Sequence, residues 1–152
     1  SEVIRAHLPR PLALRIREHG QWSPAFLPDN LFSLLFRAPS LHDGALEPDP
    51  RGMSLLLTTP YLLLLLWPRR WTPLESRALL TCLLIALPAL LYYNDGSMQF
   101  GNRFALDWLV PGLLAATIAA RRAPIALVTG LTLWGVGVGA WGLHWFRAAF
   151  ER

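Results

Sequence analysis

The sequence predicts an all-α integral membrane protein: a helical bundle of about four transmembrane helices, preceded by an irregular segment with short interfacial helices. Apolar residues make up 53% of the 152 residues and charged residues only 16%, against about 25% charged residues in soluble domains. Between positions 53 and 146, every charged residue except Asp107 lies between long apolar runs or at their ends. The alternative is a soluble bundle with fully buried helices. This alternative is disfavoured because the run Leu62 to Leu66 has no polar face.

The four apolar runs set the expected spans, which cover residues 53–67, 78–93, 104–120 and 123–146. A transmembrane helix needs about 20 apolar residues, so only the fourth run suffices alone and the others need flanking residues or a thin bilayer. Pro60, Pro88 and Pro111 lie inside the first three runs and are expected to bend their helices. Gly135 and Gly139 form a G-x-x-x-G pattern in the fourth, which favours close packing within the chain over a dimer contact.

Residues 1–52 form a separate extramembrane segment, in which seven prolines exclude any long helix. A short helix is expected over Pro11–His19, because proline suits the first helical position. A second helix is expected to be capped by Asp29 or Asn30 and to run to Phe36. Its aromatic face suits the membrane interface, and packing against the bundle is the equal alternative.

The distribution of arginine predicts the orientation. The loops after the first and third runs carry five arginines, and the loop after the second run carries only Arg103. The positive-inside rule therefore places the two arginine-rich loops in the cytoplasm, with residues 1–52 and the 94–103 loop outside. Six arginines in residues 1–51 oppose this orientation, although long external segments translocate with weaker charge dependence.

Several functional classes are disfavoured by composition. The chain has fourteen cationic residues, all of them arginine, and they form no basic stripe with interleaved aromatic residues of the kind that binds nucleic acid. Cys82 is a single cysteine inside an apolar run and is expected to behave as a small hydrophobic residue. The chain begins at Ser1 without a signal-peptide pattern, so we expect a C-terminal fragment of a larger membrane protein.

Residues 41–52 are expected to form a loop with three acidic residues, Asp43, Glu47 and Asp49. Their oxygen ligands suit divalent cations, but their spacing matches no metal-binding loop, which favours a solvated surface. The four histidines lack metal-ligand spacing such as H-E-x-x-H, and no serine elbow or phosphate loop is present. The sequence therefore predicts no metal site and identifies no cofactor.

The polar stretch 92–107, between the second and third runs, is the candidate functional site. Arg103 and Asp107 lie four residues apart, a spacing that allows pairing on one helix face. Ionisable groups persist in hydrocarbon mainly where they pair or serve a hydrated site. Two interpretations stay open: the pair locks the helix start, or Arg103 binds the phosphate of a lipid through two hydrogen bonds.

Further polar residues surround this arginine in the sequence. Asn94, Gln99 and Asn102 are candidates to line the site, where their amide groups could hold a sugar or coordinate a cation. Asp107 and Asp95 are the candidates for a catalytic carboxylate, and both are weaker hypotheses than Arg103 as a phosphate contact.

Four segments carry a resemblance to a known family: Gly20–Leu31 (GQWSPAFLPDNL), Gly52–Pro60 (GMSLLLTTP), Tyr92–Asn94 (YYN) and Gln99–Asp107 (QFGNRFALD). Over residues 20–122 the chain resembles the C-terminal half of bacterial polytopic proteins related to the family 39 glycosyltransferases, within the GT-C superfamily. The resemblance implies transfer of a sugar from a polyprenyl-phosphate donor on the outer face of the bacterial plasma membrane. Membrane lipid and this donor are the implied partners.

The resemblance also limits what this chain contributes. The catalytic acidic residue of such enzymes usually lies in a first external loop, which this chain does not contain. The chain is therefore expected to form part of the donor cavity, with Arg103 at the phosphate, and to be inactive alone. A non-catalytic membrane scaffold or transporter-like subunit, or a simple membrane anchor, is the alternative.

Overall fold

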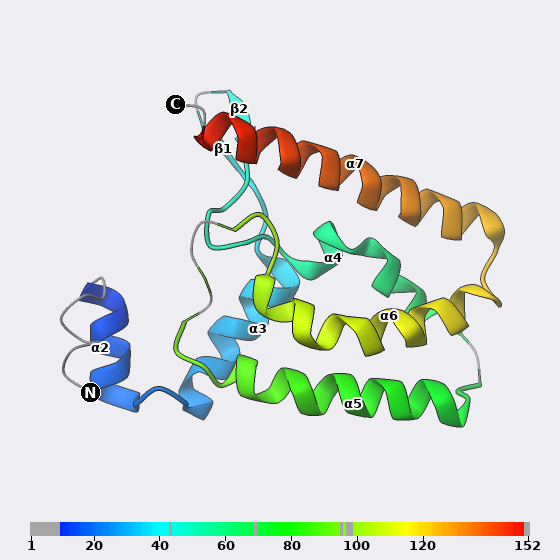
Figure 1. Ribbon diagram of the computed structural model, residues 1–152, viewed down its shortest axis with the longest axis horizontal. Helices are drawn as coiled ribbons and strands as arrows, with labels where there is room; N and C mark the ends of the chain where they lie inside the picture. The colour runs from blue at the N-terminus through cyan, green and yellow to red at the C-terminus, as the bar shows by residue number, and fades with distance from the viewer. Residues whose placement is uncertain (1–9, 43, 69, 95, 97–98, 151–152) are drawn as a thin grey trace.

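The structure is a computed structural model that describes residues 10–42, 44–68, 70–94, 96 and 99–150 (Figure 1). These residues are mostly helical, with one two-stranded antiparallel hairpin. In chain order the elements are α2 (Arg10–His19), η1 (Pro24–Phe26), α3 (Leu27–Phe36), β1 (Ser40–His42), β2 (Ala45–Glu47), α4 (Leu55–Thr58), η2 (Pro60–Leu66), α5 (Pro73–Leu90), η3 (Arg103–Ala105), α6 (Leu106–Ala120) and α7 (Ile125–Phe150).

Three helical segments are long and apolar enough to cross a membrane, by length and composition: Pro73–Leu90, Arg103–Ala120 and Ile125–Ala148. They correspond to the second, third and fourth predicted runs. The first predicted span, 53–67, is not a continuous α-helix, because the chain breaks at Thr59 (φ −136°, ψ 62°) into α4 and the 3₁₀ helix η2. Pro60 explains the break, since proline has no N–H to donate and disfavours the α conformation in the preceding residue.

The broken segment nevertheless runs the length of the other helices. At one end the Met53 N–H donates to the Phe100 carbonyl at 2.9 Å. At the other end Arg122 Nη1 donates to the Arg70 carbonyl at 2.9 Å, shortly after η2. A 3₁₀ helix rises about 2.0 Å per residue against about 1.5 Å in an α-helix, so a short segment covers more distance.

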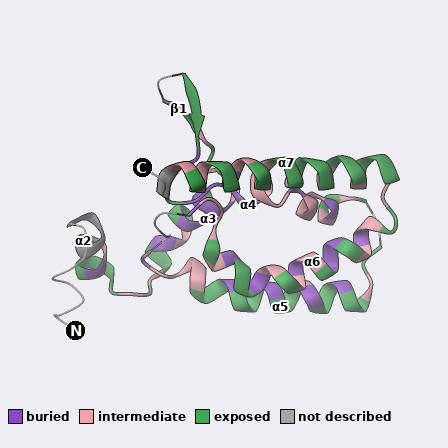
Figure 2. Ribbon diagram, turned by 45° about the horizontal axis from the view of Figure 1, so that its top comes forward, coloured by how far each residue is buried: buried purple, intermediate pink, exposed green. Residues whose placement is uncertain are grey.

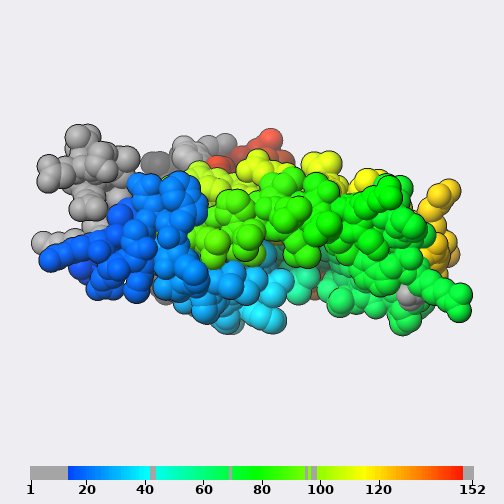
Figure 3. All heavy atoms as spheres, turned by 90° about the horizontal axis from the view of Figure 1, so that it is seen from below, coloured from blue at the N-terminus to red at the C-terminus, as the bar shows by residue number. Residues whose placement is uncertain are grey.

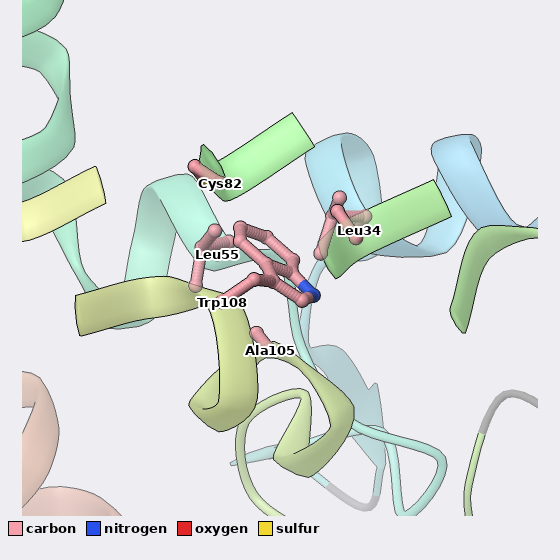
Figure 4. Close-up of a cluster of buried hydrophobic side chains, with 6 residues drawn as sticks. Leu34, Leu55, Cys82, Ala105 and Trp108 are labelled. Atoms are coloured by element: carbon pink, nitrogen blue, oxygen red, sulfur yellow. The ribbon is translucent and has the colours of Figure 1, made fainter. Parts of the chain in front are cut away.

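Helices α5 and α6 lie side by side, and α6 lies between α5 and the α4–η2 segment (Figure 1). Helix α5 begins with a capping box, in which Thr72 Oγ1 accepts from the Glu75 N–H and the Glu75 carboxylate accepts from the Thr72 N–H. Trp108 of α6 packs between Leu34, Leu55 and Cys82 (Figure 4). This cluster joins α3, α4, α5 and α6.

Helix α7 lies on the other side of α4 and η2 and is mostly exposed (Figure 2). Only 6% of its most apolar stretch of 18 residues is buried within the chain. A Cβ at Gly135 would contact Pro60 Cδ at 3.5 Å, whereas a Cβ at Gly139 would meet nothing within 4 Å. Packing of the glycine pattern within the chain is thus confirmed for Gly135 and wrong for Gly139.

The N-terminal segment lies beside the end of α5 (Figure 3). Helix α2 confirms the first predicted helix. The second prediction needs correction, because the helical region starts earlier: Ser23 Oγ accepts from the Ala25 N–H and caps η1, which leads directly into α3. Pro24 and Pro28 favour this start, since their missing N–H groups fall where no partner is needed. Asp29 and Asn30 therefore lie inside the helical region and do not cap it.

The predicted loop over residues 41–52 also needs correction. Strands β1 and β2 form an antiparallel hairpin within this region, with Leu41 opposite Leu46 and Ser40 opposite Glu47. Asp43, one of the acidic residues considered for metal binding, lies outside the described residues.

Candidate functional site

Gln99 fixes the polar loop to the N-terminal segment. Its side chain is buried, with Nε2 donating to the Arg51 carbonyl at 2.6 Å and Oε1 accepting from the Arg103 N–H at 3.2 Å. Its own N–H donates to the Pro50 carbonyl at 2.9 Å. Because both ends of the amide are engaged, Gln99 holds the loop and the start of η3 in place.

A cavity of about 470 Å³ lies beside this loop and brings together three of the predicted site residues, Gln99, Asn102 and Arg103. Two threonines at the break between α4 and η2, Thr58 and Thr59, form part of its wall. The remaining side chains are apolar or aromatic and come from α4, η3, α6, α7 and the loop: Leu55, Phe100, Ala105, Leu106, Leu109 and Phe146. The cavity wall therefore combines polar groups with hydrocarbon.

Arg103 and Asp107 do not form an ion pair in the described structure. Both residues are exposed, and the nearest aromatic contact of Arg103 is the Phe104 ring, whose centroid lies 5.4 Å from Cζ. The expectation of pairing assumed a regular α-helix, but α6 begins only at Leu106 and Arg103 lies in the 3₁₀ turn before it. Residues four apart do not share one face in a 3₁₀ helix. The interpretation as a helix lock is therefore wrong, and the guanidinium has no carboxylate partner among the described residues.

The candidate catalytic carboxylates are not brought to this cavity. Asp107 lies in the first turn of α6, where a negative charge is favourable, and it does not line the cavity wall. Asp95 lies outside the described residues.

Asn94 and Asn102 line a second, much smaller cavity of about 20 Å³ together with Asn30. Asn94 Oδ1 accepts from the Gly96 N–H at 2.9 Å. The Oδ1 atoms of Asn30 and Asn102 are buried and have no hydrogen-bond partner in the described structure. A space of this size holds about one water molecule, which could donate to both oxygens. Asn102 thus lies between the two cavities, and Asn94 belongs to the small one.

Asn30 is a site residue that the sequence interpretation misplaced as a helix cap. Its side chain is 5% exposed, and Nδ2 donates to the carbonyls of Leu90 and Tyr92, both at 2.8 Å. The signal in the sequence was an amide inside the mostly apolar stretch of α3 that follows Asp29.

An aromatic cluster holds α7 beside the larger cavity. The Phe100 ring lies 5.3 Å from the ring of Trp141 and 6.4 Å from that of Trp145. A Cβ at Gly142 would lie 2.6 Å from the Phe100 ring, so the ring occupies the space that this glycine leaves. Trp141 and Trp145 thereby pack the polar loop against α7.

The cavity combines the exposed guanidinium of Arg103, the polar side chains of Asn102 and two threonines, and apolar walls. Such a set can bind an anion attached to an apolar group. Among the described residues, no three His, Cys, Asp or Glu side chains lie close enough to hold a metal ion. No protein-family model, curated protein or solved structure matches the chain.

Proposed function

We propose that this chain forms the C-terminal membrane portion of a glycosyltransferase, and that its 470 Å³ cavity receives the phosphate of a polyprenyl-phosphate-linked sugar donor. The observation that carries the proposal is the exposed Arg103 guanidinium, without a carboxylate partner among the described residues, at a cavity with apolar walls. Arginine binds phosphate through two parallel charge-assisted hydrogen bonds. The sugar transfer itself rests on the sequence resemblance.

The polar and apolar residues of the cavity wall suit the two parts of such a donor. Asn102 and the hydroxyl group of Thr59 offer hydrogen bonds beside Arg103, where the phosphate and sugar would lie. The Thr58 hydroxyl already donates to the Ser54 carbonyl at 3.1 Å, so it can only accept. Leu55, Leu106 and their apolar neighbours offer hydrocarbon to the first isoprene units. No general base is assigned to this chain, because Asp107 does not line the cavity.

The proposed location is the bacterial plasma membrane, with the polar loop on the outer face. The two arginine-rich loops meet at the opposite end of the helices: Arg122 Nη1 lies 2.9 Å from the Arg70 carbonyl and 3.7 Å from the Glu75 carboxylate. Both loops can therefore lie on one side of a bilayer, as the positive-inside rule requires.

Photocrosslinking tests the proposed cavity. The protein in a mild non-ionic detergent is irradiated with a polyprenyl monophosphate that carries a diazirine in its first isoprene unit, and the labelled peptides are mapped by mass spectrometry. The proposal predicts labels in residues 55–59 and 105–109, which an excess of unlabelled polyprenyl phosphate removes. Labels spread over all exposed helices, or labels that the unlabelled lipid does not remove, would contradict it and favour a non-catalytic scaffold.

A further inference from the structure

A second pair of cavities lies away from Arg103, where the N-terminal segment meets α4 and α7. One cavity, of about 570 Å³, has charged side chains in its wall beside apolar ones and is called the polar cavity below; the other, of about 680 Å³, is almost entirely apolar. The two share Phe36, Arg37 and Ala38, the last turn of α3 and the residues after it. A polar and an apolar space therefore adjoin across one short stretch of chain.

The polar cavity carries an excess of positive charge. Its described lining includes three arginines, Arg15, Arg37 and Arg51, and two aspartates, Asp29 and Asp49, which leaves one net positive charge (3 − 2 = 1). The carboxylates hold the guanidinium groups around the space: Arg15 lies 3.4 Å from Asp29, and Arg37 and Arg51 lie 3.8 and 3.4 Å from Asp49. An anion of the size of a phosphate would meet several arginines already in position.

The apolar cavity lies between the α4–η2 segment and α7. Leucines 56, 57 and 63 form one wall, and Leu127, Leu131 and Trp134 form the other. Gly130 also lines this cavity, and a Cβ there would meet nothing within 4 Å. The space can accept a hydrocarbon chain that lies along α7.

The exposed face of α3 places this pair of cavities at a lipid surface. Phe32 and Phe36 are 60% and 64% exposed, their ring centroids are 6.1 Å apart, and both line the polar cavity. Exposed aromatic residues beside arginines are typical of helices that lie in the headgroup region of a bilayer. Such a position brings headgroup phosphates level with the polar cavity.

From this juxtaposition we infer that the chain binds an anionic phospholipid of the surrounding bilayer, with its phosphate among Arg15, Arg37 and Arg51 and an acyl chain in the apolar cavity beside Gly130. A free anion would use only the polar cavity, and a neutral hydrocarbon only the apolar one. An amphiphile with a negative headgroup satisfies both. This site is separate from the cavity at Arg103 and does not depend on the proposed glycosyltransferase function.

The test is native mass spectrometry of the delipidated full chain, in non-ionic detergent doped with phosphatidylglycerol or with phosphatidylcholine of the same acyl chains. Arg15→Gln removes one phosphate contact, and Arg17→Gln, at an exposed position two residues away, is its matched control. Gly130→Leu fills the apolar cavity, and Gly137→Leu, which also meets open space on α7 but lines none of the cavities described above, is its control.

The inference predicts one bound phosphatidylglycerol per chain in preference to phosphatidylcholine. Arg15→Gln and Gly130→Leu should each weaken that binding by roughly tenfold, whereas the two controls should not. Equal binding of both lipids, or equal effects of a variant and its control, would overturn the inference. Arg103→Gln should leave this lipid bound, which separates the result from that at the donor cavity.

Discussion

The side-chain Nδ2 of Asn30 lies 2.8 Å from the carbonyl oxygen of Leu90, the last residue of α5. The same nitrogen lies 2.8 Å from the carbonyl of Tyr92, so one amide from α3 satisfies two carbonyl groups at the end of another helix. The last carbonyls of a helix have no partner within it and need one from outside. Asn30 thereby ties the N-terminal segment to the point at which the polar loop begins.

Asn30→Leu should destabilise the fold by about 2–4 kcal/mol, because it removes two hydrogen bonds and leaves buried carbonyls without a partner. Chemical unfolding in non-ionic detergent, followed by circular dichroism, measures the change. Asp29→Asn is the control, since the Asp29 side chain is exposed and its contact with Arg15 is a surface ion pair, which contributes about 0–1 kcal/mol. Equal losses in the two variants would contradict the role of Asn30.

Thr72→Ala should destabilise the fold by about 1 kcal/mol, because it removes the hydroxyl that caps the first turn of α5. Thr81→Ala in the same helix provides a matched control: the Thr81 hydroxyl is exposed and only bonds back to the Arg77 carbonyl at 3.0 Å, a contact that contributes little to helix stability. The same unfolding experiment distinguishes them. A larger loss for Thr81→Ala would show that the capping box does not stabilise α5.

Gly142→Ala should loosen the contact between α7 and the polar loop, because its Cβ would meet the Phe100 ring at 2.6 Å and the ring is held by two tryptophans. Gly139→Ala should be neutral, or stabilising by up to about 1 kcal/mol through helix propensity, since its Cβ meets open space. Tryptophan fluorescence and the melting temperature report both effects. A red-shifted, less stable Gly142→Ala beside an unchanged Gly139→Ala is expected, and the reverse order would refute the contact.

Asp49 should make the N-terminal segment less stable in acid. Burial acts to raise the pKa of its carboxyl, but hydrogen bonds from Arg51 and the charges of Arg51 and Arg37 outweigh burial and lower the pKa below its ordinary value of 3.8. A lowered native pKa contributes stability that is present above pH 3.8 and is lost as the pH falls through the native value. Unfolding between pH 6 and pH 3 should therefore show a steeper loss for the wild type than for Asp49→Asn. The exposed Glu47→Gln serves as control, and a wild-type slope equal to that of Asp49→Asn would contradict the prediction.

The spanning helices could be predicted because run length and charge placement depend on composition alone. Residues 78–93, 104–120 and 123–146 correspond to α5, α6 and α7 within a few residues at most ends. The first run was equally apolar, and its failure to form one α-helix comes from the backbone at Thr59 and Pro60. Apolar composition reports the environment of a segment, but it does not distinguish an α-helix from a 3₁₀ helix.

The candidate site could be located from the sequence but not assembled. Arg103, Asn102 and Gln99 do line one cavity, yet its other polar residues, Thr58 and Thr59, come from a segment at least forty positions away. The predicted pairing of Arg103 with Asp107 was wrong because it assumed that the α-helix already included Arg103. In the structure Arg103 lies in η3, and α6 begins only at Leu106. Asn30 reaches the loop only through the packing of α3 on α5, which no local pattern encodes.

The most direct test of the proposed function is the affinity for a polyprenyl monophosphate against that for the same polyprenol without phosphate, in wild type, Arg103→Gln and Arg121→Gln. Arg121 is exposed at the far end of α6 and controls for loss of charge. If Arg103 binds the phosphate, Arg103→Gln should reduce the preference for the phosphate by roughly tenfold or more, and Arg121→Gln should leave it unchanged. A preference that is the same in all three proteins would contradict the proposed role of Arg103.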